Sequence, residues 1–204
     1  LIPQTLAFVL MVMFTAFSVM SAIVYDRQVI AHIGLIGAYA VPFLLSNDSG
    51  RYAFLFTYMS VLNAGMLAIS IKRYWTPIFY TSSLFTWVIV YGWFVSRYQP
   101  GEHFYVALTF VGIFFAIFCA TKVIHGLVHR ENSHTESLIS IVGTGFIFYC
   151  FCFAIGDSGA SLWKYAVFFS YLALVGLAIL ITSYRFYGRV LVYLAYPFTW
   201  LIFG

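Results

Sequence analysis

The sequence predicts an all-α membrane protein, a polytopic bundle of about eight transmembrane helices, and three observations lead to this fold class. Apolar residues make up 63% of the 204 residues and charged residues only 8%, whereas roughly a quarter of the residues in soluble domains are charged. The apolar residues gather in runs of about 20, the length that a helix needs to cross the hydrocarbon core. Short polar turns separate these runs.

The four runs of the first half each end at charged or turn-forming residues, and they cover residues 5–25, 29–46, 52–71 and 75–96. The residues that close them are, in order, Asp26-Arg27, Asn47-Asp48-Ser49-Gly50, Lys72-Arg73 and Arg97. The runs of the second half cover residues 103–124, 138–155, 162–182 and 190–203. The longest polar segment, residues 122–137, separates the first two of these, and the last run is short.

Small residues and a proline are combined in the second predicted helix. Gly34, Gly37, Ala38 and Ala40 would leave a surface that another helix can approach closely. Pro42 has no N–H to donate to the carbonyl of Ala38, so we expect a bend and another partner for this carbonyl.

Short sequences recur in the same order in the two halves of the chain. The matching pairs are Asp48-Ser49-Gly50 with Asp157-Ser158-Gly159, Gly65 with Gly176, and Phe85-Thr86-Trp87 with Phe198-Thr199-Trp200. They predict two four-helix repeats, residues 1–100 and 101–204. An even number of helices per copy makes the repeats parallel, although the second copy lacks the proline.

Basic residues in short loops predict the orientation in the membrane. On one side of the predicted bundle lie Arg27, Lys72, Arg73, Lys122, Arg130, Arg185 and Arg189, and on the other lie Arg51, Arg97 and Lys164. The richer side is expected to face the cytoplasm. The turns with Asp48 and Asp157 and both ends of the chain, which look cut from a longer polypeptide, would then lie outside.

Polar side chains interrupt the third and fourth predicted helices. Those of the third are Asn63, Ser60 and Thr57, roughly on one side, and those facing them from the fourth would be Ser82, Ser83 and Thr86. Two interpretations are open. The groups line a solute path, or they hydrogen-bond helices to one another.

No metal site, cofactor or catalytic set is predicted. His125 and His129 lie four residues apart, on one helical face, but histidines near a helix end need no metal. His32 would ligate haem only with His125 at a similar depth, and a histidine bonded between helices is the simpler interpretation. Asp48 and Asp157 are explained as turn formers that cap the next helix. An envelope-modifying enzyme acting there is left open without a positive signal.

Other features exclude function classes. The net charge of +4 is spread over turns, so no nucleic-acid partner is expected. The middle of each predicted helix lacks Asp, Glu, Lys and Arg, which argues against ion-coupled antiport. Cys119, Cys150 and Cys152 lie in apolar runs and are expected to be buried free thiols.

Three stretches of the first half carry a family resemblance: Gly34-Leu35-Ile36-Gly37-Ala38-Tyr39-Ala40-Val41-Pro42-Phe43-Leu44-Leu45-Ser46, Leu62-Asn63-Ala64-Gly65-Met66-Leu67-Ala68 and Lys72-Arg73-Tyr74-Trp75. They resemble the bacterial predicted membrane proteins grouped as domain of unknown function 2339, best over residues 31–90. The resemblance implies a long, many-spanning protein of the bacterial inner membrane. It brings no catalytic residues.

The first functional hypothesis is a transporter-like or channel-like protein for an uncharged or lipidic solute. Its path would pass Gly34, Gly37, Pro42 and Asn63. The alternatives are a structural membrane anchor or assembly partner in an envelope complex and, further, a haem or metal protein. The expected partners are the lipid bilayer, further transmembrane helices of the same longer chain and other envelope proteins.

Overall fold

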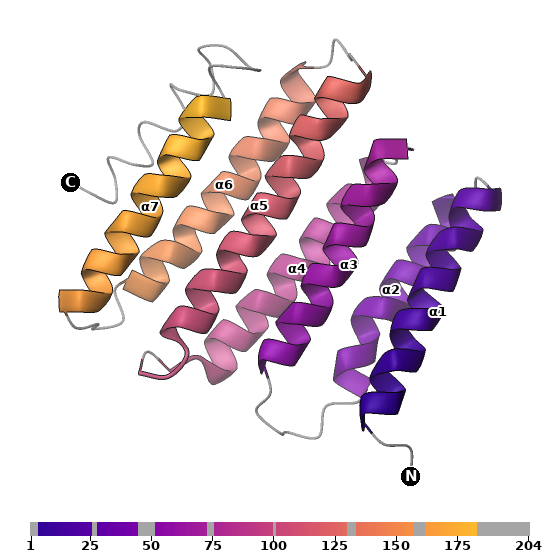
Figure 1. The fold of residues 1–204 in the computed structure, drawn as a ribbon, viewed down its shortest axis with the longest axis horizontal. Coiled ribbons are helices and arrows are strands. Elements are labelled where there is room, and N and C mark those ends of the chain that lie inside the picture. The colour runs from indigo at the N-terminus through magenta and orange to yellow at the C-terminus, as the bar shows by residue number, and fades with distance from the viewer. Residues whose placement is uncertain are drawn as a thin grey trace. The chain divides into compact units, whose positions relative to one another are not determined.

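The computed structural model describes residues 4–25, 28–44, 52–72, 76–99, 101–129, 134–156 and 162–182. Seven α-helices and no strands are found within these residues (Figure 1). The helices are α1 (Gln4–Tyr25), α2 (Gln28–Leu44), α3 (Tyr52–Lys72), α4 (Thr76–Arg97), α5 (Phe104–His129), α6 (His134–Gly156) and α7 (Leu162–Thr182). The predicted all-helical fold class is confirmed for this part of the chain. The predicted helix at 190–203 lies outside it.

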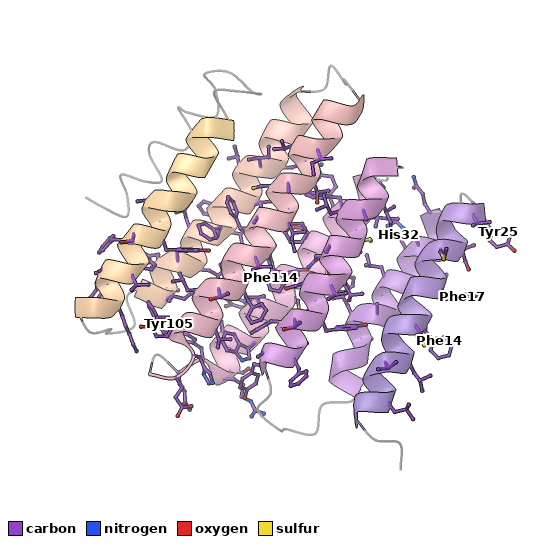
Figure 2. The ribbon with its side chains drawn as sticks, viewed as in Figure 1. Phe14, Phe17, Tyr25, His32, Tyr105 and Phe114 are labelled. Carbon is purple, nitrogen blue, oxygen red and sulfur yellow. The ribbon has the colours of Figure 1, made fainter. Side chains whose placement is uncertain are left out.

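Among the described residues, three helices contain stretches long and apolar enough to cross a membrane. These stretches are Tyr52–Ile69 in α3, Pro77–Arg97 in α4 and Phe104–Ile124 in α5. Shorter apolar stretches occur at Gln28–Ala40 and Ser140–Ile155. Large apolar side chains also point outward from the helices. Phe17 of α1 is 71% exposed, and Figure 2 shows it beside Phe14 on the outer side of that helix. These features are typical of a protein whose solvent is lipid.

The chain forms two compact units, residues 1–92 and 93–204, and α4 begins in the first and ends in the second. The two predicted repeats have a similar boundary, but the repeat relationship itself stays a prediction. Several of the residues that suggested it, including both Asp-Ser-Gly turns, lie outside the described residues.

In the first unit, α1 packs closely against α2 at Gly34. A Cβ atom at Gly34 would lie 2.9 Å from the Cβ of Ser18, so only glycine allows this approach. Gly37 differs, because it is exposed and a Cβ there would meet nothing within 4 Å. Ala38 is buried, whereas Ala40 is exposed. The expected close helix approach therefore depends on Gly34 and does not extend to Gly37 or Ala40.

In the second unit, aromatic side chains fill the space between α5, α6 and α7. The rings of Phe115 and Phe148 stack with their centroids 4.5 Å apart, and Phe148 is fully buried. The ring of Tyr171 on α7 reaches α5 at Gly112, and its hydroxyl lies where a Cβ of residue 112 would be. Gly112 is thus a notch into which a tyrosine fits.

The boundaries of α5 and α6 differ from the prediction. The polar segment predicted at 122–137 is mostly helical, because α5 continues to His129 and α6 already begins at His134. Polar residues in the sequence mark where a helix leaves the apolar layer of the membrane. The helix itself continues past that point when the following residues have a high helix propensity. His125 and His129 therefore lie in the last turns of a helix.

Candidate functional site

Four polar side chains from three helices meet in the first unit, and we call them the polar cluster: Tyr39 of α2, Asn63 of α3, and Ser82 and Thr86 of α4. None of the four is more than 2% exposed. Ser82 and Thr86 lie four residues apart, so they share one face of α4. Asn63 and Thr86 both lie within apolar stretches able to cross a membrane.

Asn63 is the centre of the polar cluster. Its Oδ1 accepts hydrogen bonds from the hydroxyls of Tyr39, at 2.8 Å, and Ser82, at 2.7 Å. Its Nδ2 donates to Thr86 Oγ1 at 3.0 Å. One amide therefore joins α2 and α4 to α3, with its oxygen and its nitrogen assigned by the network.

The hydroxyl protons can be placed without conflict. Thr86 donates to the backbone carbonyl of Ser82 at 2.8 Å and accepts from Asn63, while Ser82 and Tyr39 both donate to Asn63 Oδ1. The Tyr39 oxygen also lies 2.9 Å from Thr86 Oγ1 and 3.1 Å from Ser82 Oγ. All four side chains are thus hydrogen-bonded within the polar cluster, as buried polar groups require.

A second polar contact joins α2 to α3 where the proline interrupts the hydrogen bonds of α2. The hydroxyl of Tyr58 donates to the backbone carbonyl of Ala38 at 3.0 Å, and Tyr58 is buried. Pro42 has no N–H to donate to this carbonyl, yet α2 continues as a helix to Leu44. The partner expected for this carbonyl is therefore a tyrosine from α3.

The structure brings Asn63, Ser82 and Thr86 together but leaves out two residues predicted to lie beside Asn63. Ser60 is half-buried and Thr57 exposed, and each donates to a carbonyl of its own helix, at 2.8 and 2.6 Å. A step of three residues falls about 60° short of a full helical turn, so Thr57 lies about 120° around α3 from Asn63. Both hydroxyls therefore form their hydrogen bonds within α3 rather than with another helix.

Sequence reasoning missed Tyr39 as a member of the polar cluster. Tyrosine is abundant in this chain and is common where helices meet the lipid headgroups, so its presence alone gave no signal. Its place among the small residues Gly37, Ala38 and Ala40 was the available signal. Small neighbours let the ring reach an adjacent helix, where it also stacks on Phe85 at a centroid distance of 5.6 Å.

The described residues do not bring the weaker candidates for a functional site together. His32 is half-buried, and its Nδ1 lies 2.9 Å from the carbonyl of Gln28 on the same helix. The side chains of His125 and His129, the Pro42 ring, and all of Asp48 and Asp157 lie outside the described part of the chain. Among the described residues, no group of three or more His, Cys, Asp or Glu could hold a metal ion. The haem pairing of His32 with His125 stays a prediction.

Two expectations about individual residues need correction. Cys152 is buried and Cys119 half-buried, but Cys150 is exposed, because neighbouring positions on α6 point in different directions. Lys122, counted with a cytoplasmic loop, lies inside α5 and is only 1% exposed. A buried lysine cannot count toward the loop charge that orients the chain.

Comparison with known families gives a match to this chain. The family model described as "Predicted membrane protein (DUF2339)" matches residues 1–157, a longer stretch than residues 31–90 where the motifs lie. No curated protein and no solved structure matches the chain.

Proposed function

Since the chain belongs to this family of predicted membrane proteins, DUF2339, we propose that it is a structural membrane module, an anchor or assembly partner in a larger envelope protein. The polar cluster supports this role. Its four side chains hydrogen-bond one another across α2, α3 and α4 and are almost fully buried. A solute path needs polar groups that offer their hydrogen bonds to the solute, whereas these groups use them to hold helices together.

Reaction with a water-soluble thiol reagent tests this proposal. Cys119, Cys150 and Cys152 are first replaced by alanine, and a single cysteine is then introduced as Ser82→Cys, a near-isosteric change. Glu102→Cys, at an exposed position outside the membrane-spanning stretches, is the matched control. In membranes, the cysteine at 82 should stay unmodified under conditions that modify the cysteine at 102 completely. Rapid modification at 82 would mean that water reaches the polar cluster, which contradicts a purely structural role.

The second candidate is a transporter-like or channel-like protein for an uncharged or lipidic solute. The observation that favours it is Pro42, which leaves the Ala38 carbonyl without its helical N–H partner three residues after Tyr39 in α2, so that Tyr58 of α3 bonds this carbonyl instead. Transporters build solute sites from interrupted helices of this kind. The path would pass Gly34, Gly37, Pro42 and Asn63, and rapid labelling at position 82 is the result that this candidate expects.

We also place the module in the inner membrane of a bacterium, as two parallel four-helix repeats. The two Asp-Ser-Gly turns, with Asp48 and Asp157, would face outward. Without Lys122, the basic residues that support this orientation are Arg27, Lys72, Arg73, Arg130, Arg185 and Arg189 inside, against Arg51, Arg97 and Lys164 outside.

A further inference from the structure

The backbone of α2 takes a hydrogen-bond donor from another helix at one point. In a regular α-helix the carbonyl of Ala38 would accept the N–H of residue 42, but residue 42 is a proline and has no N–H. The hydroxyl of Tyr58 on α3 donates to this carbonyl at 3.0 Å. A bond between two helices thus takes the place of a bond within α2.

The surroundings of this bond are apolar. Ala38 and Tyr58 are both buried, and they lie in apolar stretches of their helices, Gln28–Ala40 and Tyr52–Ile69. A backbone carbonyl without a donor is strongly unfavourable in such surroundings, because hydrocarbon offers no hydrogen bond. The Ala38 carbonyl keeps the Tyr58 donor only while α3 is packed against α2.

Few side chains of α3 could supply this donor. Among the buried side chains that the structure describes in α3, only those of Tyr58 and Asn63 carry a hydrogen-bond donor. The amide of Asn63 is engaged in the polar cluster. A helix packed here without a hydroxyl at the level of Tyr58 would therefore leave the Ala38 carbonyl without this partner.

The next residue of α2 is bonded to α3 in the opposite direction. Tyr39 donates its hydroxyl to Asn63 at 2.8 Å, whereas Ala38 accepts from Tyr58. Two adjacent residues of α2 are thus bonded to residues five apart on α3, which lie about 7.5 Å apart along its axis. These two bonds together fix the rotation of α2 and its level along α3.

We propose that Pro42 and Tyr58 act together as a latch that specifies α3 as the packing partner of α2. The proline removes the helical donor of the Ala38 carbonyl and Tyr58 replaces it, so the carbonyl is paired when the two helices pack correctly. A proline inside a helix usually weakens the helix, but here it favours one neighbouring helix over others. The latch lies outside the polar cluster and does not depend on either candidate function.

Equilibrium unfolding of the whole chain in detergent tests the latch, with Tyr58→Phe and Pro42→Ala measured singly and together. In the parent protein, Tyr58→Phe takes the donor from the Ala38 carbonyl and should raise the unfolding equilibrium constant about thirtyfold. In the Pro42→Ala background, the restored N–H of residue 42 can bond this carbonyl. The same change should then raise the constant less than about threefold. Where Tyr58→Phe alone does not fold, adding Pro42→Ala should restore folding.

Two controls separate the latch from general effects of the substitutions. Pro77→Ala removes a proline from the first turn of α4, where a backbone N–H has no helical acceptor, and should leave the effect of Tyr58→Phe unchanged. Tyr91→Phe removes a hydroxyl from an exposed position of α4 and should change the constant about twofold or less in both backgrounds.

An effect of Tyr58→Phe that is equal in the parent and in the Pro42→Ala background would overturn the proposal, because the two residues would then act independently. Failure of Pro42→Ala or of the double variant to fold would also overturn it, since the latch requires that the N–H of residue 42 can replace Tyr58.

Discussion

Replacing Asn63 with leucine is expected to lower the free energy of unfolding by about 2 kcal/mol. Leucine has the same branched arrangement of side-chain heavy atoms but removes the amide that joins Tyr39, Ser82 and Thr86. Interhelical hydrogen bonds in membranes contribute about 0.6 kcal/mol each on average, and leaving their buried partners unpaired costs about 1–3 kcal/mol. Thr86 keeps its bond to the Ser82 carbonyl, which limits the loss.

Equilibrium unfolding in detergent measures this effect. Ser60→Ala is the matched control on the same helix, because the Ser60 hydroxyl bonds only locally to the Phe56 carbonyl in the described structure. It should change the stability by less than about 0.5 kcal/mol. A stability of Asn63→Leu equal to that of Ser60→Ala would show that the polar cluster does not stabilise the helix bundle.

Replacing Gly112 with alanine is expected to lower the stability by about 2 kcal/mol through steric overlap with Tyr171. The new methyl group would occupy the place of the tyrosine hydroxyl, and the rigid ring must move away from α5. Alanine is a better helix former than glycine by about 1 kcal/mol, so any net loss is due to packing.

Gly143→Ala provides the control for helix propensity, because a Cβ at this exposed position would meet nothing within 4 Å. It should raise the stability by up to about 1 kcal/mol. Adding Tyr171→Phe to Gly112→Ala should restore part of the loss, since the overlapping hydroxyl is removed. If Gly112→Ala stabilised the protein as much as Gly143→Ala, the described packing of α7 on α5 would be incorrect.

The helices could be predicted from the sequence because apolar runs of sufficient length have few alternatives in lipid. The ends of α5 and α6 could not, since a helix continues beyond the apolar layer when its residues favour it. Lys122 shows the consequence: its charge suggested a loop, but the extended α5 carries it as a buried side chain.

The candidate site was predicted in part. Asn63, Ser82 and Thr86 stand out as polar residues within apolar helices, and they do meet. Tyr39 did not stand out, because a tyrosine can satisfy its hydroxyl at the headgroups as well as inside a bundle. The prediction that Thr57 lies on the same side of α3 as Asn63 was wrong, because residues spaced three apart shift progressively around a helix. The Thr57 hydroxyl instead bonds a carbonyl of its own helix.

The central claim is that hydrogen bonds of the polar cluster stabilise the packing of α2, α3 and α4. A double-mutant cycle between Tyr39 and Asn63 tests this claim most directly. Tyr39→Phe and Asn63→Ala are measured singly and together by equilibrium unfolding. The 2.8 Å hydrogen bond between these side chains predicts a coupling free energy of about 1 kcal/mol. A coupling that cannot be distinguished from zero would contradict the account.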